Sequence, residues 1–530
     1  MTIPELIGIH SYEQIPIVTI VEKDDQILLN TPDAEWYKIL YCLSWKIYQP
    51  YAADYYNALY DFNQFPKKEA DNPSANIETK EEATERIMKN RPTMDKNEPV
   101  IYRPEFKKPS EENVSPEKVA PGVPPKRSRG KKPKCFFALF KSYLGVLLMG
   151  FPAEPENVYK HLISNLPFAR VCGFIPKGAD ENYWYKHVPS LRKLEQFDQI
   201  MTEYGIWHNM KWNEVKRNIE DGVIEMENVL VGDTTHYHAY SGFETITYTD
   251  EDGQEKRKSQ SKVTKNCNCE DKANCPHPWV LTDEGAGTIV KAHNKMIWGH
   301  KASILGFPLQ GIPLDAVAMT DAATFDGETL YPHIELLFKT MPELKSWIDT
   351  VLYDSACDDH KLKDQFKDKE GMDIILKTSM NPRRRLPVTK NLPTGMVKIT
   401  PQGNMTCKGG FNMDYIGTRY DSEKFIYRAP CDENGLPKCS DCEHKATCCP
   451  LAKDGRVVTI SFDMLPHIDV EDPPMAKRFK VMMKLRPSVE RMIKRLKCDM
   501  SDDRLKKRGN DSFQASLDKT MLAFHIMLRD

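Results

Sequence analysis

Long apolar runs are missing from this sequence of 530 residues. Its longest strongly apolar stretch, YLGVLLMG at residues 143–150, is far too short to span a bilayer. The opening MTIPELIGIH has no basic region followed by an apolar run, so we expect no secretory signal. An excess of charge is also missing, because 74 Lys and Arg face 76 Asp and Glu. We therefore expect a cytoplasmic protein with no membrane partner, in which the distribution of charge matters more than its sum.

The N-terminal part of the chain divides by composition. Residues 1–63 are predicted to be a helical, aromatic-rich module whose role the sequence does not define. Residues 64–134 are polar, with repeated Pro, Lys and Glu and no sustained apolar period, which is typical of a linker. Residues 135–220 are predicted to form short helices with Lys and Arg at their ends. That pattern suits a DNA-binding region, but it suits other helical domains as well.

Strand signals begin after residue 221. Short apolar runs predict five strands, at residues 229–231, 296–305, 315–320, 347–354 and 372–381. A helix is expected near residues 327–341, between the third and fourth strands. Successive strands, a helix and further strands predict an α/β fold, a mixed sheet with flanking helices.

Three acidic residues are notable for their positions. Asp233 and Asp354 each follow a short apolar run, and sites in open α/β sheets collect at strand ends. Glu490 is the single acid among six basic residues in KLRPSVERMIKRLK, residues 484–497. Carboxylates are the ligands that Mg²⁺ prefers, and two such ions can catalyse phosphoryl transfer. The alternative is structural, because Asp at strand ends often caps turns.

The segment around Glu490 is predicted to be a helix with two distinct faces. Its apolar stripe, expected to face a core, consists of Val489, Met492, Ile493 and Leu496. The adjoining face carries Arg486, Glu490, Lys494 and Lys497. This face is either a set of solvated ion pairs or a metal-binding carboxylate beside cations that hold a polyanion.

The residues around the third acid resemble the DDE transposases of bacterial insertion sequences. The resemblance is to the cut-and-paste branch, which has an RNase H-like catalytic fold and carries Tyr, Arg, Glu and Lys at fixed spacing. Arg486, Glu490 and Lys497 match that spacing, whereas Met483 stands where the branch has Tyr.

Three further segments are similar to motifs of the same family. GDTT at residues 232–235 is similar to the first-acid motif, and LYDSACDD at 352–359 to the second. WGHKASIL at 298–305 resembles the family's Gly-Tyr-Lys strand, with His300 in the aromatic position. The segment around Asp326 resembles the one that precedes the family's helix, which implies a structural role for that acid.

The resemblance implies a domain layout and an activity. Residues 221–381 and 479–530 would form the RNase H-like catalytic domain, and 382–478 an inserted Cys-rich β module. Asp233, Asp354 and Glu490 would hold two Mg²⁺ (or Mn²⁺) ions, and Arg486 and Lys497 would contact DNA phosphates.

The activity implied is that of a transposase. It would act as a nuclease and strand transferase on double-stranded DNA, joining transposon terminal repeats to target DNA. The protein would work as a homo-oligomer at the bacterial nucleoid.

Further basic clusters are candidate DNA contacts. The predicted linker ends in a short basic arm that resembles the minor-groove hook of chromatin proteins. The arm carries Lys126, Arg127, Arg129, Lys131 and Lys132. A second cluster follows the fifth strand and consists of Lys377, Arg383, Arg384 and Arg385. A solubilising linker end and a solvated loop are the respective alternatives.

The 14 Cys include two tightly spaced groups, which indicates reduced thiols and metal rather than disulfides. The first group is expected to hold structural Zn²⁺ through Cys431, Cys439, Cys442 and Cys448, with Cys407 and Cys449 as further thiols. The second, between the first two strands, is a weaker zinc candidate formed by Cys267, Cys269, Cys275 and His277. Free buried thiols are the alternative.

Two other functions stay open. One is a transposase-derived DNA-binding protein that no longer cuts. The other is a zinc-dependent regulatory or scaffold protein. Loss of DNA cleavage on replacing one acid would separate the transposase from both.

Overall fold

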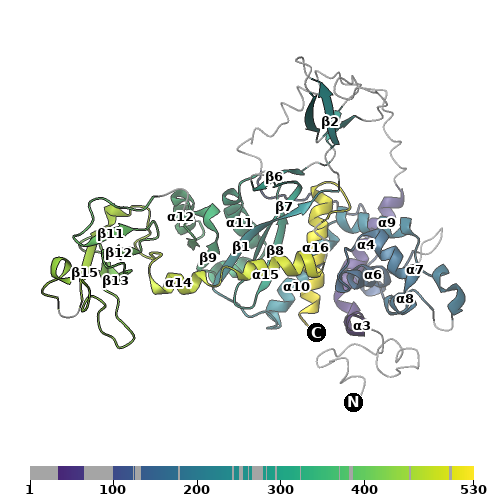
Figure 1. Ribbon diagram of the computed structural model, residues 1–530. Coiled ribbons are helices and arrows are strands. Elements are labelled where there is room, and N and C mark those ends of the chain that lie inside the picture. The colour runs from purple at the N-terminus through teal and green to yellow at the C-terminus, as the bar shows by residue number, and fades with distance from the viewer. Residues whose placement is uncertain are drawn as a thin grey trace.

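The structure of the protein is a computed structural model (Figure 1). The residues that it describes are 34–64, 99–122, 124–125, 133–176, 179–240, 244–249, 255–260, 262–264, 279–281, 283, 285–292, 295–322, 324–368, 371–380, 386–452, 455–500 and 504–529.

The helices of the N-terminal part pack into one body beside a sheet (Figure 1). They are α3 (Ala34–Cys42), α4 (Gln49–Gln64), α6 (Phe136–Leu148), α7 (Pro155–Ser164), α8 (Leu166–Cys172), α9 (Leu191–Glu203) and α10 (Ile206–Glu220). Aromatic rings fill the centre: the ring centroid of Tyr55 lies 5.6 Å from that of Phe136 and 5.0 Å from that of Phe197. Residues 34–64 therefore share a core with the helical region, because α4 packs against α6, α9 and α10.

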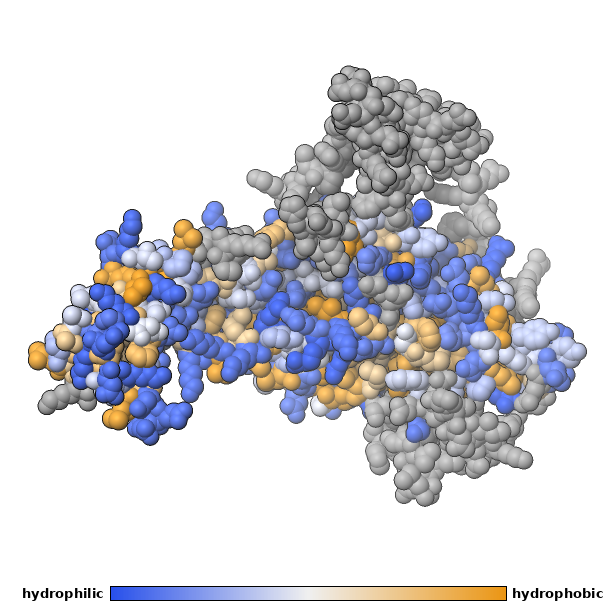
Figure 2. Space-filling model, viewed as in Figure 1, coloured by the Kyte–Doolittle hydropathy of each residue, from blue (hydrophilic) through white to orange (hydrophobic). Residues whose placement is uncertain are grey.

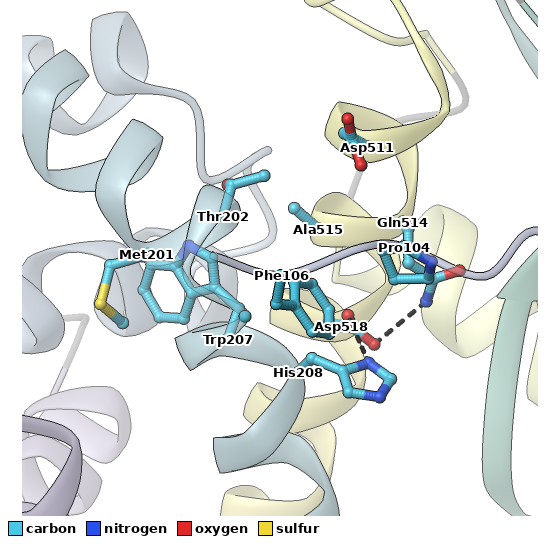
Figure 3. Close-up of a pocket in the computed structure, with 11 residues that line it drawn as sticks. Pro104, Phe106, Met201, Thr202, Trp207, His208, Asp511, Gln514, Ala515 and Asp518 are labelled. Carbon is cyan, nitrogen blue, oxygen red and sulfur yellow. Dashed lines mark hydrogen bonds and ion pairs between the residues drawn. The ribbon is translucent and has the colours of Figure 1, made fainter. Parts of the chain in front are cut away.

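Part of the predicted linker is packed against this body. The side chain of Asn57 accepts the backbone N–H of Val114 at 2.9 Å and donates to its carbonyl at 3.1 Å. Phe106 lies between α10 and α16 (Asn510–Met527), as Figure 3 shows. Its ring covers Gly205, where φ is +66° and an added Cβ would meet the ring at 2.5 Å. Only glycine fits that turn without displacing the ring.

The sheet has six strands. They are β1 (Val229–His238), β6 (Gly287–Ala292), β7 (Lys295–Phe307), β8 (Ile312–Ala318), β9 (Thr350–Tyr353) and β10 (Ile375–Thr378). The order is β10-β9-β1-β7-β6, and β8 also pairs with β7. β1, β9 and β10 run parallel, and β7 runs antiparallel to β1, β6 and β8.

All five predicted strands are present in this sheet, as β1, β7, β8, β9 and β10, so the α/β prediction is confirmed. Between β1 and β6 the chain forms two further strand pairs. These are β2 (Glu244–Thr249) with β3 (Glu255–Gln260), and β4 (Lys262–Thr264) with β5 (Trp279–Leu281).

Helices cover both faces of the sheet because its central strands alternate side chains between two cores. Leu230 and Val351 belong to the main core, to which α11 (Leu330–Thr340) and α16 contribute. Val231 and Leu352 face the other way and pack with α15 (Ser488–Lys494).

A separate module lies at the far end of the molecule (Figure 1). Its elements are β11 (Met396–Ile399), β12 (Met405–Cys407), β13 (Asp414–Arg419), β14 (Lys424–Arg428), α13 (Lys445–Cys448) and β15 (Val457–Ser461). It has its own apolar core, which includes Phe425 and Tyr427. α12 (His360–Lys367) precedes β10, and α14 (Lys477–Met483) leads from the module back to α15.

The junction with the module is ionic. The carboxylate of buried Asp472 pairs with Lys377 of β10 and with Arg478 of α14. Lys367 adds a second link to Asp469 at 2.6 Å. Lys377, a predicted DNA contact, is therefore buried in an ion pair.

No described helix has both the length and the apolarity needed to cross a bilayer. The apolar stretch predicted at residues 143–150 forms most of the last two turns of α6, which is buried in the helical body.

Candidate functional site

Two of the predicted acids lie on or directly after neighbouring strands of the sheet, Asp233 within β1 and Asp354 just after β9. The parallel register pairs Val231 with Leu352, and both side chains face α15. Asp233 and Asp354 each come two residues later. Because strand side chains alternate, Asp233 falls on the α15 side. Asp354 lies near enough to raise the pKa of Asp233.

The strand-end prediction is wrong for Asp233 and holds for Asp354. β1 continues to His238 because β7 keeps pairing with it after β9 has ended. Asp354 follows β9 directly, and its Oδ1 accepts the N–H of Ala356 at 2.8 Å. Asp354 therefore also makes the turn cap that was its structural alternative.

The predicted apolar stripe beside Glu490 is confirmed, and the start of its helix is shifted. Val489, Met492 and Leu496 are buried in the body of the protein. α15 begins at Ser488, after a turn, so Arg486 precedes the helix instead of lying on its face.

Arg486 joins the first and third acids. Its Nη2 lies 2.7 Å from Oδ2 of Asp233, and its Nη1 lies 2.8 Å from Oε1 of Glu490. The side chain of Arg486 is only 19% exposed, and that of Glu490 is 62% exposed. One guanidinium thus bridges two carboxylates that are distant in the sequence.

Arg486 does not fully compensate the negative charge of the Asp233 carboxylate. Burial raises the pKa of its carboxyl from 3.8 to about 6, even though Arg486 and the Thr234 N–H act in the opposite direction. The negative charges of Asp354 and Asp326 raise it further. The site therefore has an excess of negative charge that a cation would relieve.

Two residues near these acids, Asp326 and Lys301, were not predicted from the sequence to be parts of the site. Asp326, in the short helix Asp326–Glu328, lies near enough to raise the pKa of Asp233. It pairs with the buried ammonium of Lys301 on β7, which also donates to the carbonyl of Thr324 at 2.8 Å. No local pattern signals this pair, because β7 and the short helix meet only in the folded protein.

Lys497 contacts the protein itself in this structure. It lies in a π-helical turn, Arg495–Asp499, after α15. Its ammonium donates to the backbone carbonyl of His236 and lies 5.1 Å from the ring centroid of Tyr237. His300, in the family's aromatic position, is buried between Asp283 and Asn510 at 3.2 and 3.1 Å.

The donor chemistry of the acids fits a hard divalent cation, since carboxylate oxygens are what Mg²⁺ binds. Among the described residues, however, no group of three or more His, Cys, Asp or Glu side chains is arranged to hold a metal ion as it stands. At the acids the physical reason is Arg486, whose guanidinium lies between Asp233 and Glu490.

The thiols of the module line one pocket. The cysteines that line this pocket are Cys407, Cys439, Cys442, Cys448 and Cys449. His444 also lines the pocket, whereas Cys431, a member of the predicted zinc set, does not. Burial, together with the neighbouring thiol of Cys439, raises the pKa of Cys449.

Several predicted contacts lie outside the described residues. They are the basic arm at 126–132, the candidate zinc ligands Cys267, Cys269, Cys275 and His277, and the basic run at 383–385.

No protein-family profile matches the chain, and no curated protein matches it. Among solved structures, the chain is similar to a piggyBac transposase in a synaptic complex with hairpin DNA. The TM-score is 0.29 and the sequence identity is 10%, over 74% of this chain and 64% of that chain. A likeness with so low a TM-score does not establish a common fold.

Proposed function

We propose that the protein is a DDE-type DNA transposase with an RNase H-like catalytic domain. The observation that carries the proposal is the position of Asp233 relative to the other two acids. Asp354 lies near enough to raise the pKa of Asp233, and Arg486 ties Glu490 to Asp233.

The topology of the sheet supports the proposal. β8, β7 and β1 run antiparallel in succession, and β9 and β10 extend the sheet as parallel strands. Five strands in this order and direction are what an RNase H-like domain requires. Helices on both faces complete the layers.

In this proposal Asp233, Asp354 and Glu490 would hold two Mg²⁺ or Mn²⁺ ions. Bound there, such ions would supply activation of a water or 3′-hydroxyl and stabilisation of the leaving oxygen. Asp233 accepts the N–H of Thr234 at 2.8 Å, which fixes the orientation of its carboxylate on β1. Arg486 would contact DNA phosphate, for which its planar fork offers paired donors. The substrate is double-stranded DNA, bound by a homo-oligomer.

The test is cleavage of DNA that spans the ends flanking the protein's own gene. Wild type is compared with Asp233→Asn and Glu490→Gln in Mg²⁺ and in Mn²⁺. Asp364→Asn, which replaces an exposed acid of α12, is the matched control. We expect cleavage by wild type and the control, and none by the two site variants.

Each other outcome has a meaning. Equal cleavage by Glu490→Gln would remove that acid from the mechanism. DNA binding without cleavage by the wild type would favour the inactive DNA-binding relative.

We also propose that the module holds a structural Zn²⁺ ion through thiols of its Cys-lined pocket. The proximity of Cys439, Cys442 and Cys448 to one cavity supports this, since Zn²⁺ is bound as thiolate complexes that draw ligands together. Elemental analysis should find zinc in wild type and in Cys498→Ser, whose thiol is exposed outside the module. A zinc content of Cys439→Ser/Cys442→Ser equal to that of the wild type would refute the assignment.

A further inference from the structure

The segment from α14 to the end of the π-helical turn concentrates positive charge. Between residues 477 and 500 it carries nine basic and two acidic side chains, in a chain whose net charge is -2. α14 and α15 follow one another between the module and α16 (Figure 1). We call this stretch the α14–α15 ribbon.

The fold determines which side of the ribbon faces outward. Val489, Met492 and Leu496 are buried against the sheet and α16. Helical geometry then turns Arg491 and Arg495 to the opposite side, and both are exposed. Figure 2 shows hydrophilic residues gathered over this region.

The exposed cations of the ribbon have few acids to pair with. Glu490 forms an ion pair with Arg486, and Arg478 forms one with Asp472. Among the described residues, no ion pair involves Lys477, Lys480, Lys484, Arg491, Lys494 or Arg495.

This arrangement costs the isolated protein free energy. Arg491 lies three residues from Lys494 and four from Arg495, and like charges at these spacings on a helix repel one another. A solvated helix ordinarily intersperses acids, as Glu490 would if it were free. A row of unpaired cations is instead complementary to a polyanion.

We infer that the exposed side of the α14–α15 ribbon binds the phosphate backbone of duplex DNA, an inference that rests on the proposed function. Because Glu490 and Arg486 lie within the ribbon, a duplex on it would pass beside Asp233. The ribbon cations hold phosphates and so position the duplex, without reading its sequence. The residues concerned lie outside the Arg-Glu-Lys signature.

An anionic membrane is the competing polyanion, and the structure disfavours it. A helix that lies on a membrane inserts an exposed apolar face among the lipids. The apolar face of α15 is buried in the protein core, with Val489 and Met492 both 0% exposed. The exposed residues of α15 are Glu490, Arg491 and Lys494, and Val481 of α14 is the ribbon's one large hydrophobic side chain that is more than half exposed among the described residues.

The test measures binding of a labelled random-sequence duplex by fluorescence anisotropy, in EDTA and over a series of salt concentrations. The ribbon variant is Lys484→Gln/Arg491→Gln. The control variant is Lys339→Gln/Lys361→Gln, which removes two exposed cations from α11 and α12. Thermal unfolding checks that each variant folds as the wild type does.

We expect the ribbon variant to bind several-fold more weakly at about 0.1 M salt and the slope of log K against log salt to fall by about two. The control should retain the wild-type slope. An unchanged slope in the ribbon variant, or an equal loss in the control, would overturn the inference. Binding to phosphatidylserine vesicles but not to duplex DNA would also overturn it.

Failure of this inference is separable from failure of the proposed chemistry, because binding in EDTA needs no metal. If the ribbon variant loses duplex binding and the wild type does not cleave DNA in Mg²⁺, DNA binding by the ribbon is supported and the nuclease activity is rejected. If the wild type cleaves DNA and the ribbon variant has an unchanged salt slope, the nuclease activity is supported and DNA binding by the ribbon is rejected.

Discussion

Buried charges are handled in opposite ways in two regions of this protein. Where the helical body meets the sheet, Lys211 of α10 is fully buried and lies 2.8 Å from Asp315 of β8 and 3.1 Å from Asp518 of α16. His333 adds a contact to Asp315 at 3.3 Å. His208 likewise lies 3.1 Å from Asp518. At the candidate site, Arg486 pairs with Asp233 and Glu490, and the nearby Asp354 and Asp326 add negative charge.

The pKa values record the difference. Burial alone would raise the pKa of Asp315, but Lys211 and His333 outweigh burial and hold it far below its ordinary value. For Asp233, burial outweighs Arg486, and the pKa rises to about 6. The acids of the helical body are therefore compensated by their cations, whereas the charge of Asp233 is not.

Removing the cation of the paired network should have the largest effect on stability. Lys211→Met leaves Asp315 and Asp518 buried without their shared partner. We expect a loss of about 3–5 kcal/mol in the free energy of unfolding. Urea titration of the variant against wild type measures it.

The control for this prediction is Lys216→Met on the same helix, whose side chain is partly exposed. It should change stability by less than about 1 kcal/mol. Equal losses in both variants would mean that helix α10, and not the ion network, is the sensitive element.

Replacing Asp233 by the neutral Asn should change the free energy of unfolding in a pH-dependent way. The folded-state pKa of Asp233, about 6, exceeds its unfolded value of 3.8, so the stability from its bound proton is present below about pH 4 and is lost as pH rises through 6. Relative to wild type, Asp233→Asn should therefore gain up to about 3 kcal/mol between about pH 4 and pH 7.

Urea titrations across that pH range measure the gap between the two proteins. The exposed control Asp364→Asn should follow the wild type at every pH. A gap that stayed constant would mean that Asp233 titrates alike in the folded and unfolded chains.

Replacing the bridging arginine should change the affinity for divalent ions. In the present structure the guanidinium of Arg486 lies between Asp233 and Glu490. Without that competitor, Arg486→Gln should bind Mn²⁺ several-fold more tightly, a gain of about 1 kcal/mol. Isothermal titration of the DNA-free protein measures this, with Arg491→Gln as the control. Weaker binding in Arg486→Gln would show that the arginine helps to assemble the carboxylates.

The smallest effect on stability is expected for Glu490→Gln, a variant in which DNA cleavage should be lost. Glu490 is 62% exposed, and its visible partner is Arg486, four residues earlier. Glu490→Gln should therefore change the free energy of unfolding by less than about 0.5 kcal/mol. A loss of several kcal/mol would make Glu490 a structural residue, and its effect on cleavage would no longer test the mechanism.

Local patterns in the sequence were sufficient for five of the six strands of the sheet and for the stripe of α15, whereas β6 was not predicted. The apolar runs predict β1, β7, β8, β9 and β10, since burial on a sheet requires such runs. Val489, Met492 and Leu496 are buried as their helical spacing predicts. The same patterns stopped β1 too early, because the residues after Val231 are polar and only the pairing with β7 keeps them extended.

Contacts between distant segments could not be predicted in this way. The sequence alone determined that Asp233, Asp354 and Glu490 are candidates, because each is an acid in an informative local setting. Only the tertiary structure decided that Arg486 joins two of them, that Lys301 neutralises Asp326, and that Lys377 is buried with Asp472. The physical reason is that an ion pair depends on where two distant segments of the chain meet in space, whereas strand and helix periodicity depend on neighbours in the sequence.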